Sequence, residues 1–565
     1  MNPSLSPHYT APRADRPLAT AMPADQEPKS LPPSHVSSLL RDPAALAILL
    51  FFFLLIASSS LFKRLDHDEH QFVAPGALLA RRGLVPYRDY PFFHTPYLIY
   101  LNAAVFHLTK RLLLGARWVS ILSAFGTLTL FYHAAASLFH SFGRRTRLIA
   151  AAAATFLLVA NPIYVYTTGR AWNHDAPMFL ALASFFAAMR GIRRQRAAWL
   201  FLAGVLIGLA SGARLTFIVA SAIMLAVPFL APSLSWPRRL RFAAALAFGL
   251  GLALLPLALL ALKFRDQFVF GNFTYPMLNT AFRSASGYAK AMTPLQKLRY
   301  LFIDTLLPPL TLVAAILLII LVIIARRRWR QAGNPFRLET QVLTLLSLTM
   351  LAAGAAPTPL FQPYFYTPVV LLALLGVYCA AAAWSDAANR TLVTRLLAIV
   401  LLVCIGPAAY AYRAVLWSWN PHWWVPVGVH QEGVDLARAC DAAIAPRRSH
   451  SAPRPRVLSI IPLVPLEGGL DVFEQLATGP FTVRIAAAVA EQDEALPKIM
   501  DPNDVARAFW STPNAVVLVG SRDHWEEDQL LQAIGPSRLR CLPAPHDYQL
   551  WTRPPKTVAA TRPSK

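Results

Sequence analysis

Three carboxylates follow the first long apolar stretch of the chain. The apolar run 48–62 and two basic residues precede the segment LDHDEHQF, which contains Asp66, Asp68 and Glu69. A carboxylate where a membrane helix emerges into water can serve as a general base. The spacing of Asp66 and Asp68 could also hold a divalent cation through carboxylate oxygens. The alternative for Asp66 or Asp68 is helix capping, although one cap does not account for three acids.

A second acid and several cations occur beside later apolar runs. Asp175 lies in the segment WNHDAP and directly precedes an apolar run, so helix capping is an equal alternative to a catalytic or binding role. Arg214 lies between two apolar runs with almost no loop, and a charge so close to membrane depth usually has a function. The other candidate cations for an anionic group are Arg88, Arg170 and His94, of which His94 could simply fill a turn before Thr95-Pro96.

The composition indicates that membrane helices position these residues. The chain has 565 residues, of which 56% are hydrophobic, and a formal net charge of +24. A positive charge of this size can indicate nucleic-acid binding. Here the basic residues form short clusters between apolar runs, as the positive-inside rule produces. We therefore expect a polytopic membrane protein that binds no nucleic acid.

Four basic clusters set the expected topology. They lie at 144–147, 190–196, 238–241 and 326–330. If all four face the cytoplasm, two crossings must separate each from the next, which gives about eleven transmembrane helices when 97–108 does not cross. The N-terminus would then be cytoplasmic and the C-terminal part extracytoplasmic, and the acids would share the outer face with Arg214.

The remaining segments divide the chain into three expected parts. Residues 1–41 are rich in Pro, Ser and Ala, which indicates a disordered cytoplasmic leader. Residues 42–413 form the transmembrane domain, with outer loops at 63–96 and 263–304. Residues 417–565 are expected to form a small extracytoplasmic α/β domain, with short strands in RVLSIIPLV and NAVVLVG, a helix in HWEEDQLLQAI and a terminal strand or hairpin.

The four cysteines give no clear disulfide pattern. Cys379 and Cys404 lie inside apolar runs, whereas Cys440 and Cys541 lie in the C-terminal part. The last two could form a disulfide in an oxidising compartment, and coincidence is an equal alternative.

These residues together resemble a known family. The acid pair after the first span, then PYRDYPFFHTPYLIYL and ARWVSILSAFGTLTLFY, resembles the GT-C superfamily of polyprenyl-phosphate-sugar-dependent glycosyltransferases. The nearest branches are the protein O-mannosyltransferases and the lipid A aminoarabinose transferase. The resemblance covers roughly residues 43–410, the size of one large membrane domain.

The resemblance also implies roles for particular residues. The family's Asp-Glu pair falls on Asp68 and Glu69, with the Asp as base or acceptor ligand, and a second family Asp falls on Asp175. A family lysine corresponds to Arg214. The Lys-Pro-Pro motif of the aminoarabinose branch is replaced here by His94-Thr95-Pro96, so a titratable cation stands where a lysine is usual. An aromatic segment with Tyr364 and Tyr366 resembles a donor-binding segment of the family but lacks its arginine.

The leading hypothesis is an inverting glycosyltransferase of a bacterial inner membrane. It would move one sugar from a polyprenyl-phosphate donor to a glycan, lipid or protein acceptor. Asp68 would act as base, with Glu69 and Asp66 as electrostatic neighbours and Asp175 as an acceptor ligand. The phosphate and donor contacts would be Arg214, Arg88, His94, Arg170, Tyr364 and Tyr366, with a divalent cation at Asp66 and Asp68 left open. The alternatives are a flippase for a lipid-linked saccharide, which internal repeats would favour, and a membrane scaffold, which leaves the acids without a role.

Overall fold

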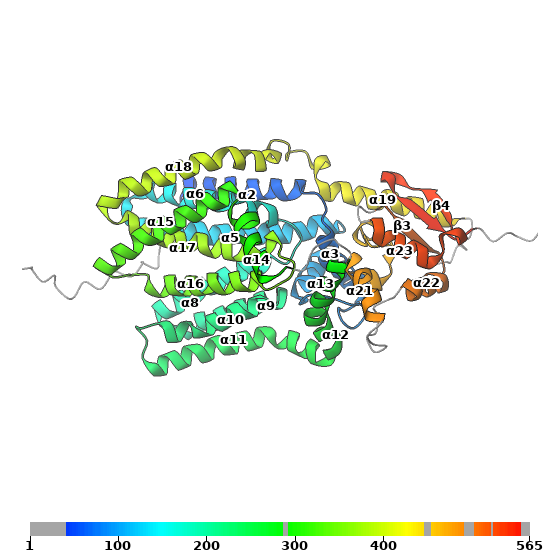
Figure 1. Ribbon diagram of the computed structural model, residues 1–565, viewed down its shortest axis with the longest axis horizontal. Helices are drawn as coiled ribbons and strands as arrows, with labels where there is room; N and C mark the ends of the chain where they lie inside the picture. The colour runs from blue at the N-terminus through cyan, green and yellow to red at the C-terminus, as the bar shows by residue number, and fades with distance from the viewer. Residues whose placement is uncertain (1–40, 286–291, 446–453, 491–501, 521–523, 555–565) are drawn as a thin grey trace, which may run out of the picture.

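The computed structural model describes residues 41–285, 292–445, 454–490, 502–520 and 524–554. In this part of the chain, a bundle of long helices occupies one end of the molecule and a small sheet with its helices occupies the other (Figure 1). The expected leader falls almost entirely outside the described residues. So does part of the second outer loop, at 286–291.

Eight described helices are long and apolar enough to cross a membrane. They are α2 (Pro43–Phe62), α5 (Leu112–Leu138), α8 (Asp175–Arg194), α11 (Trp236–Lys263), α15 (Pro309–Ala332), α16 (Arg337–Ala355), α17 (Tyr366–Trp384) and α18 (Ala387–Ala411). Three shorter helices occupy the other expected spans: α6 (Arg144–Val159), α9 (Ala197–Ala213) and α10 (Phe217–Leu230). A multi-pass membrane protein is confirmed, while the count of eleven crossings stays a prediction.

Polar contacts place two of the four basic clusters, at 144–147 and 190–196, at one end of this bundle. Arg144, at the start of α6, pairs with Asp42 at the start of α2, with 2.7 Å between Nη2 and Oδ1. Arg193, near the end of α8, pairs with Glu339 in the first turn of α16. The opposite ends of α2 and α8 carry the acidic segment and Asp175. These two basic clusters and the acids therefore lie at opposite ends of the bundle, as the positive-inside pattern predicts.

Short elements cover the acidic end of the bundle. They are α3 (His67–Arg82), α4 (Tyr97–Phe106), α7 (Pro162–Thr167), α12 (Arg265–Val269), the π-helical η2 (Phe270–Thr274), α13 (Tyr275–Ala285), α14 (Pro294–Tyr300), the π-helical η3 (Leu301–Leu306) and the 3-10 helix η4 (Gln362–Phe365). The ten residues of α4 extend only about 15 Å, about half of a hydrocarbon core. This length fits the expected non-crossing segment.

The C-terminal part forms a five-stranded sheet with the strand order β2-β1-β3-β5-β4. The strands are β1 (Arg456–Leu458), β2 (Asp471–Val472), β3 (Ala515–Val519), β4 (Arg540–Pro543) and β5 (Gln549–Thr552). Parallel pairing joins β1 to β2 and β3, and antiparallel pairing joins β5 to β3 and β4. The helices here are α19 (Val425–Ile444), α20 (Leu463–Glu467), α21 (Pro480–Ala490), α22 (Pro502–Ser511) and α23 (His524–Ile534).

The local predictions for this part are largely confirmed. NAVVLVG forms β3, HWEEDQLLQAI forms α23, and the terminal segment forms the β4–β5 hairpin. RVLSIIPLV contains only the three-residue strand β1, after which the chain turns into α20. The single-turn 3-10 helices are η1 (His140–Phe142), η5 (Arg413–Leu416), η6 (Pro421–Trp423), η8 (Glu474–Leu476), η9 (Pro536–Arg538) and η10 (Pro545–Asp547).

The C-terminal part packs directly on the short elements at the acidic end of the bundle. Arg81 of α3 donates from Nη1 to the Leu466 carbonyl at 2.7 Å. Glu467 accepts from the Leu113 N–H at the start of α5, also at 2.7 Å, and its other oxygen lies 2.9 Å from His430 Nδ1. Glu467 thus supplies the N-terminal cap that α5 does not obtain from Arg111, its own N-cap residue.

Of the two alternatives for Cys440 and Cys541, the structure shows unpaired thiols. Cys440 is buried in α19, Cys541 is exposed on β4, and both are free thiols. Burial also raises the pKa of the Cys440 thiol to about 12, so it behaves as a packing residue. Cys379 and Cys404 are buried as well, in agreement with their apolar sequence context.

Candidate functional site at the acidic end of the bundle

The first acid of the cluster caps the first outer helix. The side chain of Asp66 accepts from the Asp68 N–H at 3.0 Å, and Glu69 Oε2 accepts from the Asp66 N–H at 3.0 Å. This reciprocal arrangement is a capping box, which satisfies N–H groups that the first turn of α3 leaves unpaired. The capping alternative is therefore confirmed for Asp66.

Glu69 forms a buried ion pair with an arginine that the sequence analysis missed. Arg117 of α5 donates from Nε to Glu69 Oε1 at 2.9 Å and from Nη2 to Oε2 at 2.8 Å, and both side chains are 0% exposed. Glu69 Oε1 also accepts from the Ala171 N–H at 2.9 Å. Burial disfavours the charged form, but the charge and hydrogen bonds of Arg117 and the Ala171 N–H together lower the pKa of Glu69.

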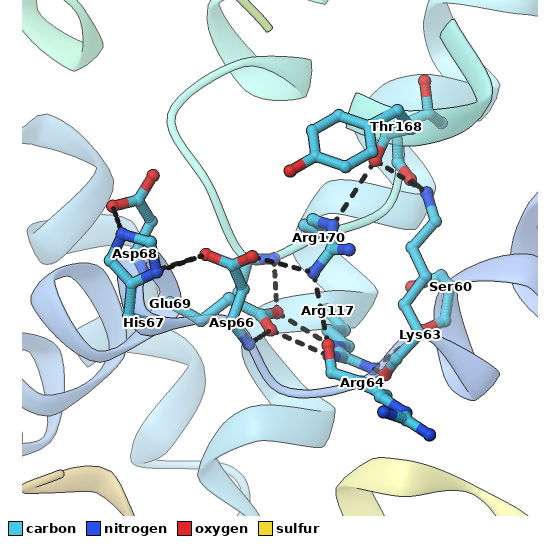
Figure 2. Close-up of polar contacts among 12 residues, drawn as sticks. Ser60, Lys63, Arg64, Asp66, His67, Asp68, Glu69, Arg117, Thr168 and Arg170 are labelled. Carbon is cyan, nitrogen blue, oxygen red and sulfur yellow. Dashed lines mark hydrogen bonds and ion pairs between the residues drawn. The ribbon is translucent and has the colours of Figure 1, made fainter. Parts of the chain in front are cut away.

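Arg117 also secures the end of the first membrane helix. Its Nη1 donates to the carbonyls of Ser60 and Lys63, each at 2.8 Å, and its Nη2 donates to the Arg64 carbonyl at 3.3 Å (Figure 2). One guanidinium therefore joins α2, α5 and α3. We assign Glu69 and Arg117 to the framework of the site, because neither side chain is accessible.

The loop between α7 and α8 is fixed by a second set of contacts. Lys63 Nζ donates to the carbonyls of Val165 and Thr168, each at 2.5 Å, and these carbonyls lie at the C-terminal end of α7. Burial lowers the pKa of Lys63 to about 7. Gly169 follows with φ of +81°, and a Cβ there would meet Ser60 Cβ at 2.6 Å, so only glycine fits against α2.

Arg170 pairs with the capping acid. Its Nη1 lies 3.4 Å from Asp66 Oδ2 and 3.2 Å from the Arg64 carbonyl (Figure 2). Its guanidinium also lies 5.3 Å from the ring centre of Tyr166 and 5.0 Å from that of Trp172. Burial and the neighbouring charge of Asp68 raise the pKa of Asp66, which His67 and Arg170 partly offset. The expected phosphate contact at Arg170 is thus engaged within the framework.

Asp175 and Tyr366 form another buried pair in the same framework. Asp175 Oδ1 accepts from the Tyr366 hydroxyl at 2.7 Å, and Oδ2 accepts from the Gly169 N–H at 2.7 Å. Both residues are buried, at 1% and 0% exposure. Asp175 is the first residue of α8, but its carboxylate holds the Gly169 loop and α17 rather than capping its own helix. This geometry assigns both residues to positioning the loop.

Asp68 differs from the other acids of the site. Its side chain is 38% exposed and lies in the first turn of α3, where its carboxylate contacts His67 Nε2 at 3.3 Å and Gln71 Nε2 at 3.3 Å. Both contacts are with residues of the same helix. His67 is partly exposed, and Gln71 is neutral. Among the acids predicted for the site, Asp68 alone combines exposure with the absence of an arginine partner among the described residues.

Arg214 lies close enough to Asp68 for their charges to interact. Arg214 ends α9, and its Nη1 lies 2.6 Å from His174 Nδ1. Burial lowers the pKa of Arg214 to about 10, while Tyr364 and Asp68 act in the opposite direction. At neutral pH the guanidinium remains charged. The expectation that Asp68 and Arg214 share one end of the bundle agrees with the structure.

His94 does not supply the charge that the sequence analysis expected. Burial lowers its pKa to about 4, and the positive charge of Arg214 lowers it further, while Asp68 acts in the opposite direction. The imidazole is therefore neutral at pH 7. Its ring packs against Phe72, with centroids 5.1 Å apart. His94 can donate or accept a hydrogen bond but is not a cation.

Arg88 forms its contacts within its own turn, with Asp89 and the Gly83 carbonyl. Its Nη2 lies 2.7 Å from Asp89 Oδ2 and 3.1 Å from the Gly83 carbonyl, and its side chain is 49% exposed. The adjacent Asp89 raises the pKa of Arg88. Arg88 thus belongs to a surface turn after α3, and we remove it from the candidate phosphate contacts.

A divalent cation would find its ligands in the acidic segment. Asp66, His67 and Asp68 each offer one ligand atom, and these atoms lie within 4.8 Å of one another. Mixed oxygen and nitrogen ligands suit ions such as zinc or manganese. The residues fit a cation, with His67 added to the expected pair, although Asp66 is already used by the helix cap and Arg170. The cation stays a proposal.

Helix α13 adds residues that the sequence analysis did not single out. Tyr275 stacks on Phe93 of the first outer loop, with ring centroids 3.7 Å apart, and Arg283 lies over Phe361, 4.9 Å from its ring centre. Phe361 in turn lies beside Tyr364, at 5.7 Å between centroids. Polar residues four apart in an amphipathic outer helix were the available signal.

Comparison with known structures identifies this architecture. ArnT from Cupriavidus metallidurans bound to undecaprenyl phosphate matches with a TM-score of 0.57 and 15% identity, covering 92% of this chain and 97% of that one. The apo state of ArnT matches with a TM-score of 0.58 and 13% identity, covering 92% and 98%. The chain has a GT-C fold. The fold that the sequence resemblance implied is thus confirmed.

A weaker likeness joins the chain to the Archaeoglobus fulgidus oligosaccharyltransferase, with a TM-score of 0.45, 14% identity and coverage of 91% and 75%. No family model matches the chain. No curated protein matches it either.

Proposed function

We propose that the protein is a membrane glycosyltransferase that moves a sugar from a polyprenyl-phosphate carrier to an acceptor hydroxyl, with inversion at the anomeric carbon. The observation that carries this proposal is the position of the half-exposed Asp68 within charge-interaction range of the half-buried, charged Arg214 at one end of a GT-C bundle. The structure of ArnT with undecaprenyl phosphate supports a carrier of this chemistry.

Each residue then has a defined part in the reaction. Asp68 accepts the proton of the acceptor hydroxyl, whose oxygen attacks the anomeric carbon. The bond between that carbon and the phosphate oxygen breaks, and polyprenyl phosphate leaves with the electron pair. Arg214 stabilises the charge on the leaving phosphate, with Tyr364 beside it. A bidentate guanidinium is suited to this task, which explains how Arg214 can serve without a cationic His94.

The framework residues act through position. Glu69 and Asp66 fix the first turn of α3, which carries Asp68, and Asp175 with Tyr366 fixes the loop that ends at His174. We further propose the orientation that the basic clusters indicate, in a bacterial inner membrane, with the basic end cytoplasmic and the C-terminal part outside. The acceptor is a glycan, lipid or protein that reaches this outer face.

Release of polyprenyl phosphate from sugar-charged carriers in proteoliposomes tests the proposal. We expect release to require an acceptor and to fall about 100- to 10,000-fold in Asp68→Asn, because the general base is lost. The control is Asp528→Asn, an exposed acid of α23. Movement of the lipid-linked sugar across the bilayer without release would instead establish the flippase. Release at the wild-type rate by folded Asp68→Asn would remove Asp68 from the mechanism.

A further inference from the structure

One face of α13 carries three polar side chains in a row. Tyr275, Asn279 and Arg283 are spaced four residues apart, so they project from the same side of the helix. Helix α13 packs on α21 of the C-terminal part, and its Tyr275 stacks on Phe93 of the segment that follows α3.

Two of these side chains hold buried polar atoms without a protein partner. Tyr275 is only 6% exposed, and neither its hydroxyl nor Asn279 Oδ1 has a hydrogen-bond partner among the described residues. Buried polar groups are nearly always hydrogen-bonded, because an unmade bond loses the solvation of the group. An outside ligand with hydroxyl groups would satisfy both atoms.

Aromatic contacts link this face of α13 to the neighbourhood of Asp68 at one end and to Tyr364 at the other. The Tyr275 ring lies in an apolar cluster with Phe93 and Phe481, and Phe481 lies 5.7 Å from the ring of His67, the neighbour of Asp68. At the other end of the face, Arg283 lies over Phe361, which contacts Tyr364. Burial raises the pKa of Tyr275, Arg484 and Arg283 lower it, and Asp68 and Glu526 raise it, so four charges act on this phenol.

We propose that Tyr275 and Asn279 bind the hydroxyl groups of the donor sugar, and that this sugar is uncharged. A phenol and an amide match sugar hydroxyls as donors and acceptors. The proposal rests on the function given above and adds a class of sugar to it.

The surrounding charges exclude a cationic amino sugar. Arg283 and Arg484 act on Tyr275, and Arg484 is paired with Glu526. The other acids around the site are engaged as well: Asp66 with Arg170, Glu69 with Arg117, and Asp175 with Tyr366. Asp68 remains for the base. An ammonium group on the sugar would therefore find no carboxylate other than the base, Asp68, to pair with, and Arg283 would disfavour it.

The test compares the affinity for sugar-charged and sugar-free carrier. The probes are undecaprenyl phosphate, its glucose conjugate and its glucosamine conjugate, measured by equilibrium binding to the full chain in nanodiscs. We expect Tyr275→Phe and Asn279→Ala each to weaken glucose-conjugate binding by about 3- to 10-fold while leaving sugar-free carrier unchanged. The wild type should bind the glucose conjugate at least about 10-fold more tightly than the glucosamine conjugate.

Tyr132→Phe is the matched control, because Tyr132 in α5 is also buried with an unpartnered hydroxyl but lies beside Asp42 at the basic end. An equal loss for sugar-free carrier in Tyr275→Phe, no loss for either variant, or tighter binding of the glucosamine conjugate would overturn the inference. Because binding is read without turnover, these outcomes stand apart from the transfer assay, whose failure would overturn the proposed function alone.

Discussion

Asp68 and Glu69 are adjacent in the chain, yet they belong to two regions that differ in burial and in how their charges are paired. Glu69 is 0% exposed and shares two hydrogen bonds with Arg117, within a network that joins α2, α3 and α5. Asp68 is 38% exposed and holds only local contacts, facing the charge of Arg214. The framework residues pair their charges with one another. Asp68 and Arg214, which we call the reacting region, keep charges that a ligand can contact. Under the proposed function, this difference separates the acids that position from the acid that reacts.

Breaking the framework should have the largest effect on stability. Arg117→Leu leaves Glu69 buried without its partner, so we expect a loss of about 3–5 kcal/mol in unfolding free energy. Arg438→Leu is the control, because Arg438 is 71% exposed and pairs locally with Asp435, and should cost less than about 1 kcal/mol. Thermal and denaturant unfolding in detergent measure both.

The double variant Glu69→Leu with Arg117→Leu sharpens this test. It removes both buried charges, so it should recover part of the stability that Arg117→Leu loses. Equal losses in Arg117→Leu and Arg438→Leu would show that the buried pair is not a framework element.

Acid should destabilise the reacting region through two imidazoles, His94 and His174, whose pKa values the fold lowers. The folded pKa of His94 is about 4, below its unfolded value near 6.5, and burial also lowers the pKa of His174 beside Arg214. The unfolded chain therefore binds more protons between pH 6.5 and 4, so the stability present above 6.5 is lost as pH falls through this window. For His94 alone the loss is on the order of 2–3 kcal/mol.

Melting curves from pH 7.5 to 4 for the wild type and His94→Gln measure this effect. The variant should show a shallower decline than the wild type, because one titrating imidazole is gone. His422→Gln, in an exposed turn, is the control and should follow the wild type. Parallel curves for wild type and His94→Gln would contradict a neutral His94, whose charged neighbours are Arg214 and Asp68.

Arg214 and Arg88 offer the same comparison between a charge available for a ligand and a charge already paired. Arg214→Met should weaken binding of polyprenyl phosphate by about 10- to 100-fold, because a charged hydrogen-bond donor to phosphate is lost. Arg214→Lys should recover part of the affinity, since it keeps the charge but not the bidentate geometry. Arg88→Met should bind like the wild type, because Asp89 already holds that guanidinium.

Much of the difference between the framework and the reacting region could be predicted from the sequence, and some could not. Hydropathy and basic clusters predicted the bundle and the common end of Asp68 and Arg214, and the helix-capping alternative for Asp66 or Asp68 was visible as well. The partner of Glu69 was not visible, because Arg117 lies 48 residues away inside an apolar run. Burial, which neutralises His94, also depends on contacts that no local pattern encodes. The face of Tyr275 and Asn279 was readable from its four-residue spacing.

The smallest expected effect concerns the C-terminal part, which extends the framework to a third region. Glu467 caps α5 at Leu113, one turn before Arg117, so it steadies the helix that carries the partner of Glu69. Glu467→Gln keeps an acceptor oxygen but removes the charge that faces the helix N-terminus and His430, so we expect a loss of about 0.5–1 kcal/mol in unfolding free energy. If Glu467 is framework, binding of polyprenyl phosphate should stay at the wild-type level. A loss of carrier affinity without a loss of stability would instead place Glu467 with Asp68 and Arg214 in the reacting region.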